Sequence, residues 1–305
     1  MPAATSTLEA SARRGDARAL APGFAILTGV TVCLIVLGAL VRAHEAGLAC
    51  PDWPLCFGEF VPAFDLRVAF EYSHRVLAGS VLLAFAALSI AAWRRGAGAG
   101  ARRCIVVGAV LLGIQALLGA LTVWHLLASW TVTSHLVTGN ACALTLLLTA
   151  FTLRDEGVVR APATPAARRW IPLVACVLFL QLVLGGLVSS RYAGLSCPEW
   201  PTCNGGVWFP TWHGPVGIHL MHRSNGYLLA LLLCASAWML RGDPRVGRGV
   251  RLAAALVLAQ VVVGVANVRF GIPVEITALH SLLAALLVLT VGSAVRNAFI
   301  GARRA

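Results

Sequence analysis

The chain has 305 residues, of which 59% are hydrophobic and 12% are charged. A soluble domain carries about 25% charged residues, so this composition excludes an ordinary water-soluble protein. The formal charge of +12 comes from arginine alone, and the arginines cluster in short segments between long apolar runs. This arrangement is typical of membrane topology and argues against a nucleic-acid partner.

Apolar runs of spanning length recur along the whole chain. A helix needs about 20 predominantly apolar residues to cross the hydrocarbon core of a bilayer. No small-residue cleavage site follows the first run, so we expect it to remain as a helix and not to be removed as a signal peptide. The runs predict eight membrane-spanning helices, at about residues 24–42, 69–93, 104–125, 130–152, 170–190, 215–240, 250–269 and 275–298.

The distribution of arginine predicts the orientation of these helices. Eighteen of the 24 arginines lie in the two terminal segments and in the second, fourth and sixth connections, and six lie on the other side. Positively charged segments stay in the cytoplasm, so we expect a multi-pass protein of the cell membrane with both termini cytoplasmic. The cytoplasmic parts are then a tail at 1–23, a linker at 154–169 and a tail at 301–305.

The sequence repeats itself after about 147 residues. The segment from Ala46 to Cys56 reappears from Ala193 to Cys203, with both cysteines and both prolines in register. A repeat of four helices keeps the same orientation in both halves. We therefore predict an all-α polytopic membrane protein, in which residues 24–153 and 170–300 form two tandem four-helix bundles related by parallel duplication. Further repeated residues are His74-Arg75 with His222-Arg223, Gln115 with Gln260, Gly119 with Gly264, and His135 with His280.

Four of the eight histidines, His74, His135, His222 and His280, recur in this way and are the candidate metal ligands. Each lies about five to eight residues inside the outer end of an even-numbered helix, which places all four at a similar depth. Ionisable groups inside a bilayer mark functional sites by default, and imidazole is a common axial ligand of haem iron. Each half thus predicts a bis-histidine haem site in a four-helix bundle. The alternatives are simple hydrogen bonds between helices, or zinc or copper, which would require further ligands close by.

Other repeated polar residues lie near these histidines. Arg75 and Arg223 directly follow the first histidine of each half and could pair with haem propionates. Gln115 and Gln260 could bond across helices or line the pockets, and we favour the first role.

The two halves differ one helical turn before their first histidine. Glu71 precedes His74 in the first half, whereas His219 precedes His222 in the second. A carboxylate at this place could take up protons or stabilise positive charge that develops on a substrate; the alternative is a glutamate half in water. The asymmetry predicts that the first half performs chemistry and that the second holds a permanent haem. His219 is expected to lie beside the iron ligand.

Two cysteine pairs, Cys50 with Cys56 and Cys197 with Cys203, lie in loops that the arginine count places outside. An oxidising compartment permits disulfide bonds there. Such bonds could be redox-active or could be structural staples over the mouth of the haem site, and the sequence leaves both roles open. The other five cysteines are expected to be packing residues.

These residues resemble the haem A synthase family. The segment Glu71-Tyr72-Ser73-His74-Arg75 is similar to its E-x-x-H-R signature, and the resemblance continues through the other histidines, the eight helices and the outer cysteine pair. Members of this family make haem A for cytochrome oxidase. They oxidise the C8 methyl group of haem O to a formyl group, by two successive hydroxylations and loss of water from a geminal diol.

The resemblance implies an oxidoreductase with two iron-porphyrin sites. The second half would hold a haem b cofactor between His222 and His280. The first half would bind the substrate haem O between His74 and His135, with Glu71 required for the oxidation.

The resemblance also implies partners and a disulfide bond. The partners are haem O, a haem O synthase (protohaem farnesyltransferase) as its donor, an electron donor of unidentified class, and membrane lipid, with homo-oligomerisation left open. The family's outer disulfide would fall on Cys50 and Cys56, and the role of Cys197 and Cys203 stays open.

Three other functions compete with this interpretation. A quinol-linked di-haem cytochrome b would use the same histidines for electron transfer alone, but it gives no reason for Glu71 in one half only. A disulfide-handling oxidoreductase would require Cys50 and tolerate loss of His222. A transporter would exploit the duplication, but the helices carry no sign of being broken.

Overall fold

The computed structural model describes residues 17–158 and 161–300. Arginines 13, 14, 160, 303 and 304 of the predicted cytoplasmic side, the tail at 301–305 and most of the tail at 1–23 lie outside these residues. The described chain is all-helical and contains eight α-helices. They are α2 (Ala21–Ala43), α3 (Leu66–Arg94), α4 (Ala99–Trp124), α5 (Ser129–Arg154), α6 (Pro165–Ser190), α7 (Gly214–Met239), α8 (Gly247–Arg269) and α9 (Val274–Phe299).

Each predicted helix is present, and the largest differences are at the starts of α4 and α6. Both helices begin five residues earlier than the hydropathy indicated. An apolar run marks only the part of a helix that faces hydrocarbon, whereas the hydrogen-bonded helix continues through flanking arginines. In α6 the local sequence sets the start: the Thr164 side chain accepts a hydrogen bond from the N–H of Ala167, and Pro165 occupies the first turn, where proline is favoured.

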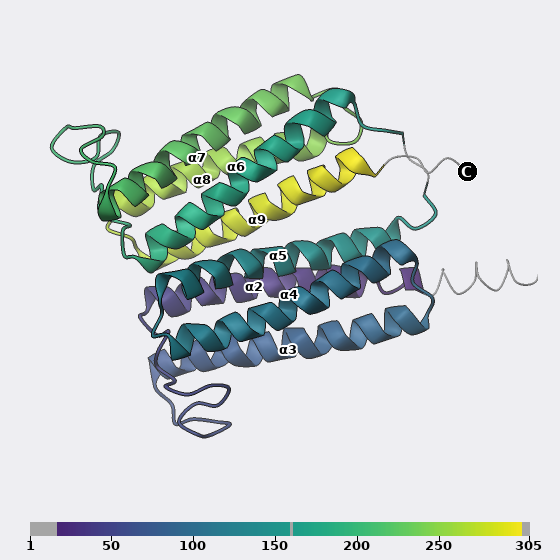
Figure 1. The fold of residues 1–305 in the computed structure, drawn as a ribbon, viewed down its shortest axis with the longest axis horizontal. Coiled ribbons are helices and arrows are strands. Elements are labelled where there is room, and N and C mark those ends of the chain that lie inside the picture. Colours follow the sequence, from purple (N-terminus) through teal and green to yellow (C-terminus); the bar gives the residue numbers. More distant parts are fainter. Residues whose placement is uncertain (1–16, 159–160, 301–305) are drawn as a thin grey trace, which may run out of the picture.

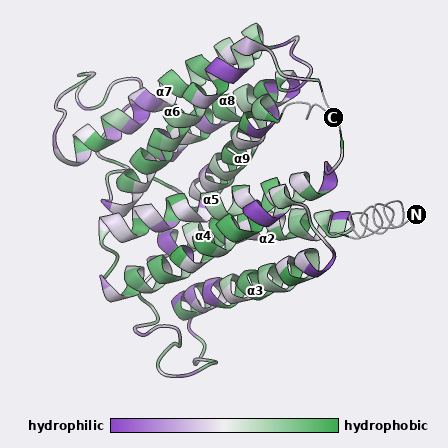
Figure 2. Ribbon diagram, turned by 45° about the vertical axis from the view of Figure 1, so that its right-hand side comes forward, coloured by the Kyte–Doolittle hydropathy of each residue, from purple (hydrophilic) through white to green (hydrophobic). Residues whose placement is uncertain are grey.

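Seven of the eight described helices are long and apolar enough to cross a membrane, and α7 is the exception. It has 26 residues, but His219, His222, Arg223 and Asn225 lie in its first half. Figure 2 shows that hydrophobic residues predominate along most of the helices. The prediction of several membrane-spanning helices is thus confirmed.

The helices form two groups, which we call the first half (α2–α5) and the second half (α6–α9); Figure 1 shows them one above the other. The halves meet where α2 packs on α9 and where α5 packs on α6 and α9. Glycine allows this close approach. A Cβ atom added to Gly186 would lie 2.8 Å from Cγ2 of Thr133, and one added to Gly292 would lie 2.4 Å from Cδ1 of Leu144.

Packing within the two halves differs at one seam. In the second half, α7 packs along both α6 and α8. In the first half, α3 packs along α2 but touches α4 at few positions. The first half is therefore more loosely closed between α3 and α4.

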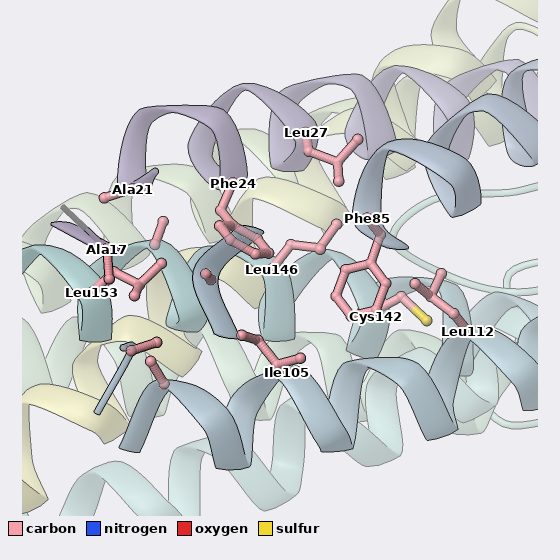
Figure 3. Packing of buried hydrophobic residues seen from close by; sticks show 14 of the residues in the cluster. Ala17, Ala21, Phe24, Leu27, Phe85, Ile105, Leu112, Cys142, Leu146 and Leu153 are labelled. Atoms are coloured by element: carbon pink, nitrogen blue, oxygen red, sulfur yellow. The ribbon is translucent and has the colours of Figure 1, made fainter. Parts of the chain in front are cut away.

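The apolar core of the first half lies at the end where α2 starts. Phe24 of α2, Phe85 of α3, Ile105 of α4 and Leu146 of α5 point toward one another there (Figure 3). The two loops that carry the cysteine pairs, residues 44–65 and 191–213, lie at the opposite end (Figure 1). Apolar packing thus holds one end of the bundle, while polar residues gather at the other.

Candidate functional site

The four repeated histidines lie at the end of the bundle that carries the cysteine loops. His74 and His222 are eight residues after the first residue of α3 and α7, and His135 and His280 are six residues after the first residue of α5 and α9. At 1.5 Å per residue, these positions are roughly 9–12 Å along the helix axis. All four side chains therefore lie at a similar level.

The two rings of the first half face each other. The ring centroids of His74 and His135 are 6.5 Å apart, with 59° between the ring planes. An imidazole nitrogen binds a first-row metal at about 2 Å, so two rings on opposite sides of one metal ion have centroids roughly 6 Å apart. In the second half, His222 of α7 and His280 of α9 lie at the same level. The rings of the first half thus face each other as the repeat predicted, and the pairing in the second half stays a prediction.

Several polar atoms at these two pairs have no partner in the described chain. They are Nδ1 of His74, His135 and His280 and the amide oxygens of Gln115 and Gln260, all of them buried. Buried polar atoms are normally hydrogen-bonded, so the pockets fit a ligand that engages imidazole nitrogen. Among the residues that the structure describes, no group of three or more His, Cys, Asp or Glu could hold a metal ion. This donor set fits an iron whose other ligands are porphyrin nitrogens better than it fits zinc.

A glycine of the neighbouring helix lies against each of the four rings. In every case the added Cβ atom would come within 3.1–3.4 Å of the ring carbon Cε1, so the ring would have to shift slightly at the three closest positions, and at Gly119 the added atom would just touch it. Glycine thus leaves room for the imidazole between two helices. The pairs are Gly38 with His74 (3.1 Å), Gly119 with His135 (3.4 Å), Gly185 with His222 (3.1 Å) and Gly264 with His280 (3.2 Å).

Glutamine side chains lie next to the histidines in both halves. Nε2 of Gln115 is 3.3 Å from Nε2 of His135, and Nε2 of Gln260 donates to the backbone oxygen of His280 at 3.0 Å. The expected bonding across helices is present. One of these two glutamines contacts an imidazole ring directly, so it also lines the pocket.

A third glutamine, Gln181 of α6, contacts the ring of His222 and was missed from the sequence. Its Nε2 atom lies 3.2 Å from Nδ1 of the ring, and its Oε1 atom accepts a hydrogen bond from Asn225 at 2.8 Å. The available signal was an uncharged polar side chain inside an apolar helix. Gln181 has no polar counterpart in the first half, so the repeated polar residues do not reveal it.

The Glu71 carboxylate is buried, with 5% of the residue exposed. Its Oε2 atom accepts a hydrogen bond from the N–H of Cys50 at 2.9 Å, and its Oε1 atom forms an ion pair with Arg75. These contacts exclude a glutamate half in water and give the carboxylate a fixed orientation, because both of its oxygens have partners. The first cysteine loop therefore positions the acidic side chain of the site.

His219 occupies the equivalent place in the second half and is also buried. Its Nδ1 atom lies 2.9 Å from the backbone oxygen of Ala193. A carbonyl oxygen can only accept, so Nδ1 carries the hydrogen and donates it. The second ring nitrogen, Nε2, lies 3.5 Å from the guanidinium of Arg223. His219 thus holds the second loop where Glu71 holds the first.

Arg75 and Arg223 lie against the loops. The guanidinium of Arg75 donates to the backbone oxygens of Cys50, Asp52 and Leu55. The guanidinium of Arg223 donates in the same way to the oxygens of residues 197, 199 and 202, at 3.1, 3.1 and 2.9 Å. Each arginine therefore fastens a cysteine loop over the histidine that precedes it in sequence, and a contact with a haem propionate stays a prediction.

Comparison with known proteins agrees with this geometry. The profile of a family described as cytochrome oxidase assembly protein matches residues 24–291. Haem A synthase of Halalkalibacterium halodurans is 32% identical over 279 residues, which cover 88% of this chain and 93% of the relative. The chain belongs to the haem A synthase family. Haem A synthase of Shewanella oneidensis is 28% identical over 304 residues, covering 85% of this chain and 91% of that relative.

Both cysteine pairs of this haem A synthase family member form disulfide bonds, Cys50 with Cys56 and Cys197 with Cys203. All four of these cysteines are buried. The bonds close two small loops of the same size over the ends of α3 and α7. This confirms the pairing that the spacing permitted, for the second loop as well as the first.

A carboxylate inside each loop holds the turn closed. Asp52 accepts hydrogen bonds from the N–H groups of Phe57 and Gly58, at 2.7 and 2.8 Å. Glu199 accepts from the N–H groups of residues 205 and 206, each at 3.0 Å, and from the hydroxyl of Thr202 at 2.8 Å. The hydrogen bond from Gly58 is the main cause that lowers the pKa of Asp52, and the hydrogen bond from residue 206 does the same for Glu199.

Proposed function

We propose that this chain converts haem O to haem A by oxidising the C8 methyl group of the porphyrin to a formyl group. Membership of the haem A synthase family supports an oxidoreductase that acts on haem O. The observation that carries the proposal is an asymmetry between two otherwise similar sites. Both halves place two histidines at one level, but only the first adds a buried carboxylate, Glu71.

The two pockets have different roles. In the first, His74 and His135 hold the substrate haem O. In the second, His222 and His280 hold a haem b cofactor. The packing supports this division, since the pocket that must admit a substrate and release a product has the loosely closed seam between α3 and α4, whereas α7 closes tightly on α8.

The two halves are the products of a parallel duplication, with residues 24–153 and 170–300 as tandem four-helix bundles. Repeated contacts support this reading: both halves have two histidine–glycine pairs and one arginine-fastened disulfide loop. We infer that α7 spans the membrane as the eighth helix, because it is as long as α6 and packs between α6 and α8.

The arginine distribution supports an orientation in the cell membrane with both termini in the cytoplasm. The cysteine loops then lie on the outer face. Disulfide bonds persist in oxidising compartments outside the cytoplasm, which agrees with this orientation. The substrate site lies below the first loop, near the outer surface.

The chemistry requires the methyl carbon to lose four electrons overall. Two successive hydroxylations, in each of which an external oxidant takes two electrons from the carbon, give a geminal diol, which loses water to leave the formyl group. Protons leave the substrate in these steps, and Glu71 is the group of this chain placed to receive them or to stabilise developing positive charge. Arg75 and the Cys50 N–H group hold its carboxylate in place. Haem b, when bound between His222 and His280, supplies one-electron transfer.

The partners follow from this chemistry. Haem O is hydrophobic and is made by a haem O synthase, which we infer to be the donor of the substrate. The electrons pass through a redox partner of unidentified class. The product serves the assembly of cytochrome oxidase, in agreement with the family description.

The test is to produce the chain together with a haem O synthase under aerobic conditions and to identify the extracted haems by mass. Haem A or its hydroxymethyl precursor should accumulate. Glu71→Gln should lower the yield by roughly 10²–10⁴-fold, the range expected for a general acid–base group. Glu59→Gln is the matched control, since that carboxylate is in the same loop region and exposed. Extracts that contain only haem B and haem O, despite well-expressed wild-type protein, would contradict the proposal.

A further inference from the structure

The seam between α3 and α4 is closed at the end of the bundle that holds the apolar core. Near the end of α3, the ring of Trp93 lies under the guanidinium of Arg102 of α4, with 4.9 Å from Cζ to the ring centroid. Eight residues before Trp93, the ring of Phe85 lies against Gly108 of α4, where an added Cβ atom would come within 3.0 Å of Cζ of the ring. These two contacts join the two helices on the side away from the cysteine loops.

Further along the seam, toward the histidines, both helices carry a glycine. Gly113 is 11 residues after Arg102, which is about three turns, and Gly79 is 14 residues before Trp93, which is about four turns. Each glycine therefore lies roughly on the side of its helix that faces the other helix. A Cβ atom added to either one would meet nothing within 4 Å. The seam is thus unfilled at this level, which is five residues along α3 from His74.

The end of the seam at the cysteine loops is covered by two tryptophans. Trp53 of the first cysteine loop lies against Trp124, the last residue of α4, with ring centroids 6.1 Å apart and 82° between the ring planes. Arg75 fastens the same loop to α3, so the loop spans from one helix to the other.

Between these two closed ends the seam faces lipid. Within the described chain, α3 and α4 pack along no helices except each other, α2 and α5, and both are apolar enough to cross a membrane. We call this opening, which Gly79 and Gly113 border between the Phe85–Gly108 and Trp53–Trp124 contacts, the lateral slot.

The second half has large side chains at both equivalent places. Tyr227 of α7 corresponds to Gly79, and Leu258 of α8 corresponds to Gly113. The hydroxyl of Tyr227 accepts a hydrogen bond from Nε1 of Trp200 at 2.9 Å, so the second cysteine loop is tied to α7 there. Since α7 also packs along α8, the lateral slot belongs to the first half alone.

The lateral slot lies beside the pocket of His74 and His135, in which a buried nitrogen of each ring lacks a partner. Haem O differs from haem B by a farnesyl chain, which is apolar and is excluded from water. We propose that the lateral slot binds the farnesyl chain of haem O, and that haem O enters the first pocket sideways from the lipid. The inference rests on the proposed function and deepens it, because it assigns a place to the group that distinguishes haem O from haem B.

The test copies the second half into the seam. Gly79→Tyr combined with Gly113→Leu fills the lateral slot with the side chains of the second half. Purified protein that carries haem b is titrated with haem O and, separately, with haem B. Binding to the first pocket is the change in absorbance that His74→Ala lacks. The affinity for haem O should fall by about tenfold or more, as expected for overpacking, and the affinity of the first pocket for haem B should not change.

Gly29→Leu is the matched control. It also adds a side chain at an exposed glycine whose Cβ atom would meet nothing within 4 Å, but α2 does not border the seam, so both haems should bind as in the wild type. An unchanged affinity for haem O in the double variant would overturn the inference. An equal loss of affinity for both haems would also overturn it, because the substitutions would then disturb the pocket and not the binding of the chain.

His74→Ala separates the two levels of argument. If it binds haem O as the wild type does, the assignment of the substrate to the first pocket fails and the inference fails with it. If binding requires His74 while the double variant binds haem O with wild-type affinity, only the role of the lateral slot fails.

Discussion

The two halves of the molecule hold their candidate histidine ligands in the same way, but the side chains next to these histidines differ. In both, a histidine packs on a glycine of the preceding helix, and an arginine fastens a disulfide loop above it. Beside the first histidine of each half, the first half has a buried carboxylate, Glu71, and the second has a buried imidazole, His219. One side chain next to a shared scaffold can thus give two similar sites different chemistry.

The packing of the helices also differs between the two halves. The half with Glu71 is loosely closed between α3 and α4, and the half with His219 is tightly closed between α7 and α8. Tight closure slows the exchange of a ligand, so the packing favours the second half as the permanent site. Variants in either half can test whether each shared or distinct feature acts in its own half.

Among the features that the two halves share, the largest effect is expected from replacing one of the glycines that pack on a histidine. Gly38→Val places a side chain against His74, because even a Cβ atom lies 3.1 Å from that ring. Overpacking costs about 1–3 kcal/mol, so haem O binding should weaken by roughly tenfold to a hundredfold. Haem A formation should fall while the haem b spectrum stays unchanged.

Gly29→Val is the control in the same helix, because a Cβ atom there meets nothing within 4 Å. It should leave both haem A formation and haem b unaffected. Loss of haem b in Gly38→Val would show that the two pockets are not independent and would break the comparison.

An intermediate effect on the rate of haem A formation is expected from loosening the first cysteine loop. Arg75→Lys keeps the positive charge but loses the planar fork that binds the backbone oxygens of Cys50, Asp52 and Leu55. Hydrogen bonds to charged groups contribute about 1.5–3 kcal/mol, so Glu71 should lose its fixed orientation and the rate of haem A formation should fall by roughly tenfold or more.

The equivalent variant in the second half separates this role from a merely structural one. Arg223→Lys loosens the fastening of the second loop, where His219 stands in place of the carboxylate, and should lower the rate of haem A formation less than Arg75→Lys does. An equal loss of rate in the two variants would argue that Arg75 only holds its loop.

The smallest effect concerns the pH dependence of the loops. The pKa of Asp52 is lowered by the hydrogen bond from Gly58, so its contribution to loop stability is present at neutral pH and is lost as pH falls through the acidic range. The protection factors of the Phe57 and Gly58 amides, which compare their exchange rates with those of an unprotected peptide at the same pH, should be high at neutral pH and lower in acid. Asp52→Asn should show low protection factors at both, and Glu59→Gln should behave as wild type. Protection factors that are independent of pH in the wild type would contradict this role of Asp52.

Much of the architecture was predictable because each element has a strong local signal. The apolar runs predicted the helices, but they did not show that some helices continue through the flanking arginines, as at the start of α6. The repeat identified the histidines, since chance does not reproduce polar residues inside apolar helices. The position of both cysteine pairs in external loops permitted disulfide bonds, and the family resemblance implied the bond between Cys50 and Cys56.

The sequence does not reveal which residues of different helices touch. These contacts account for the site residues that were not predicted. Arg75 follows His74 directly, and adjacent residues in a helix point about 100° apart, so the guanidinium turns to the loop while the imidazole turns to α5. Gln181 and the glycine cradles depend on which faces of two helices meet. That choice is made by packing over the whole bundle and leaves no signal in one helix alone.

The central claim is that two histidine pairs hold two haems with different roles. The most direct measurement is the haem content of purified His74→Ala and His222→Ala variants, produced with a haem O synthase and analysed by mass. We predict that His74→Ala keeps haem b and yields no haem A, and that His222→Ala loses haem b. Loss of haem b from His74→Ala, with haem b retained in His222→Ala, would contradict the account.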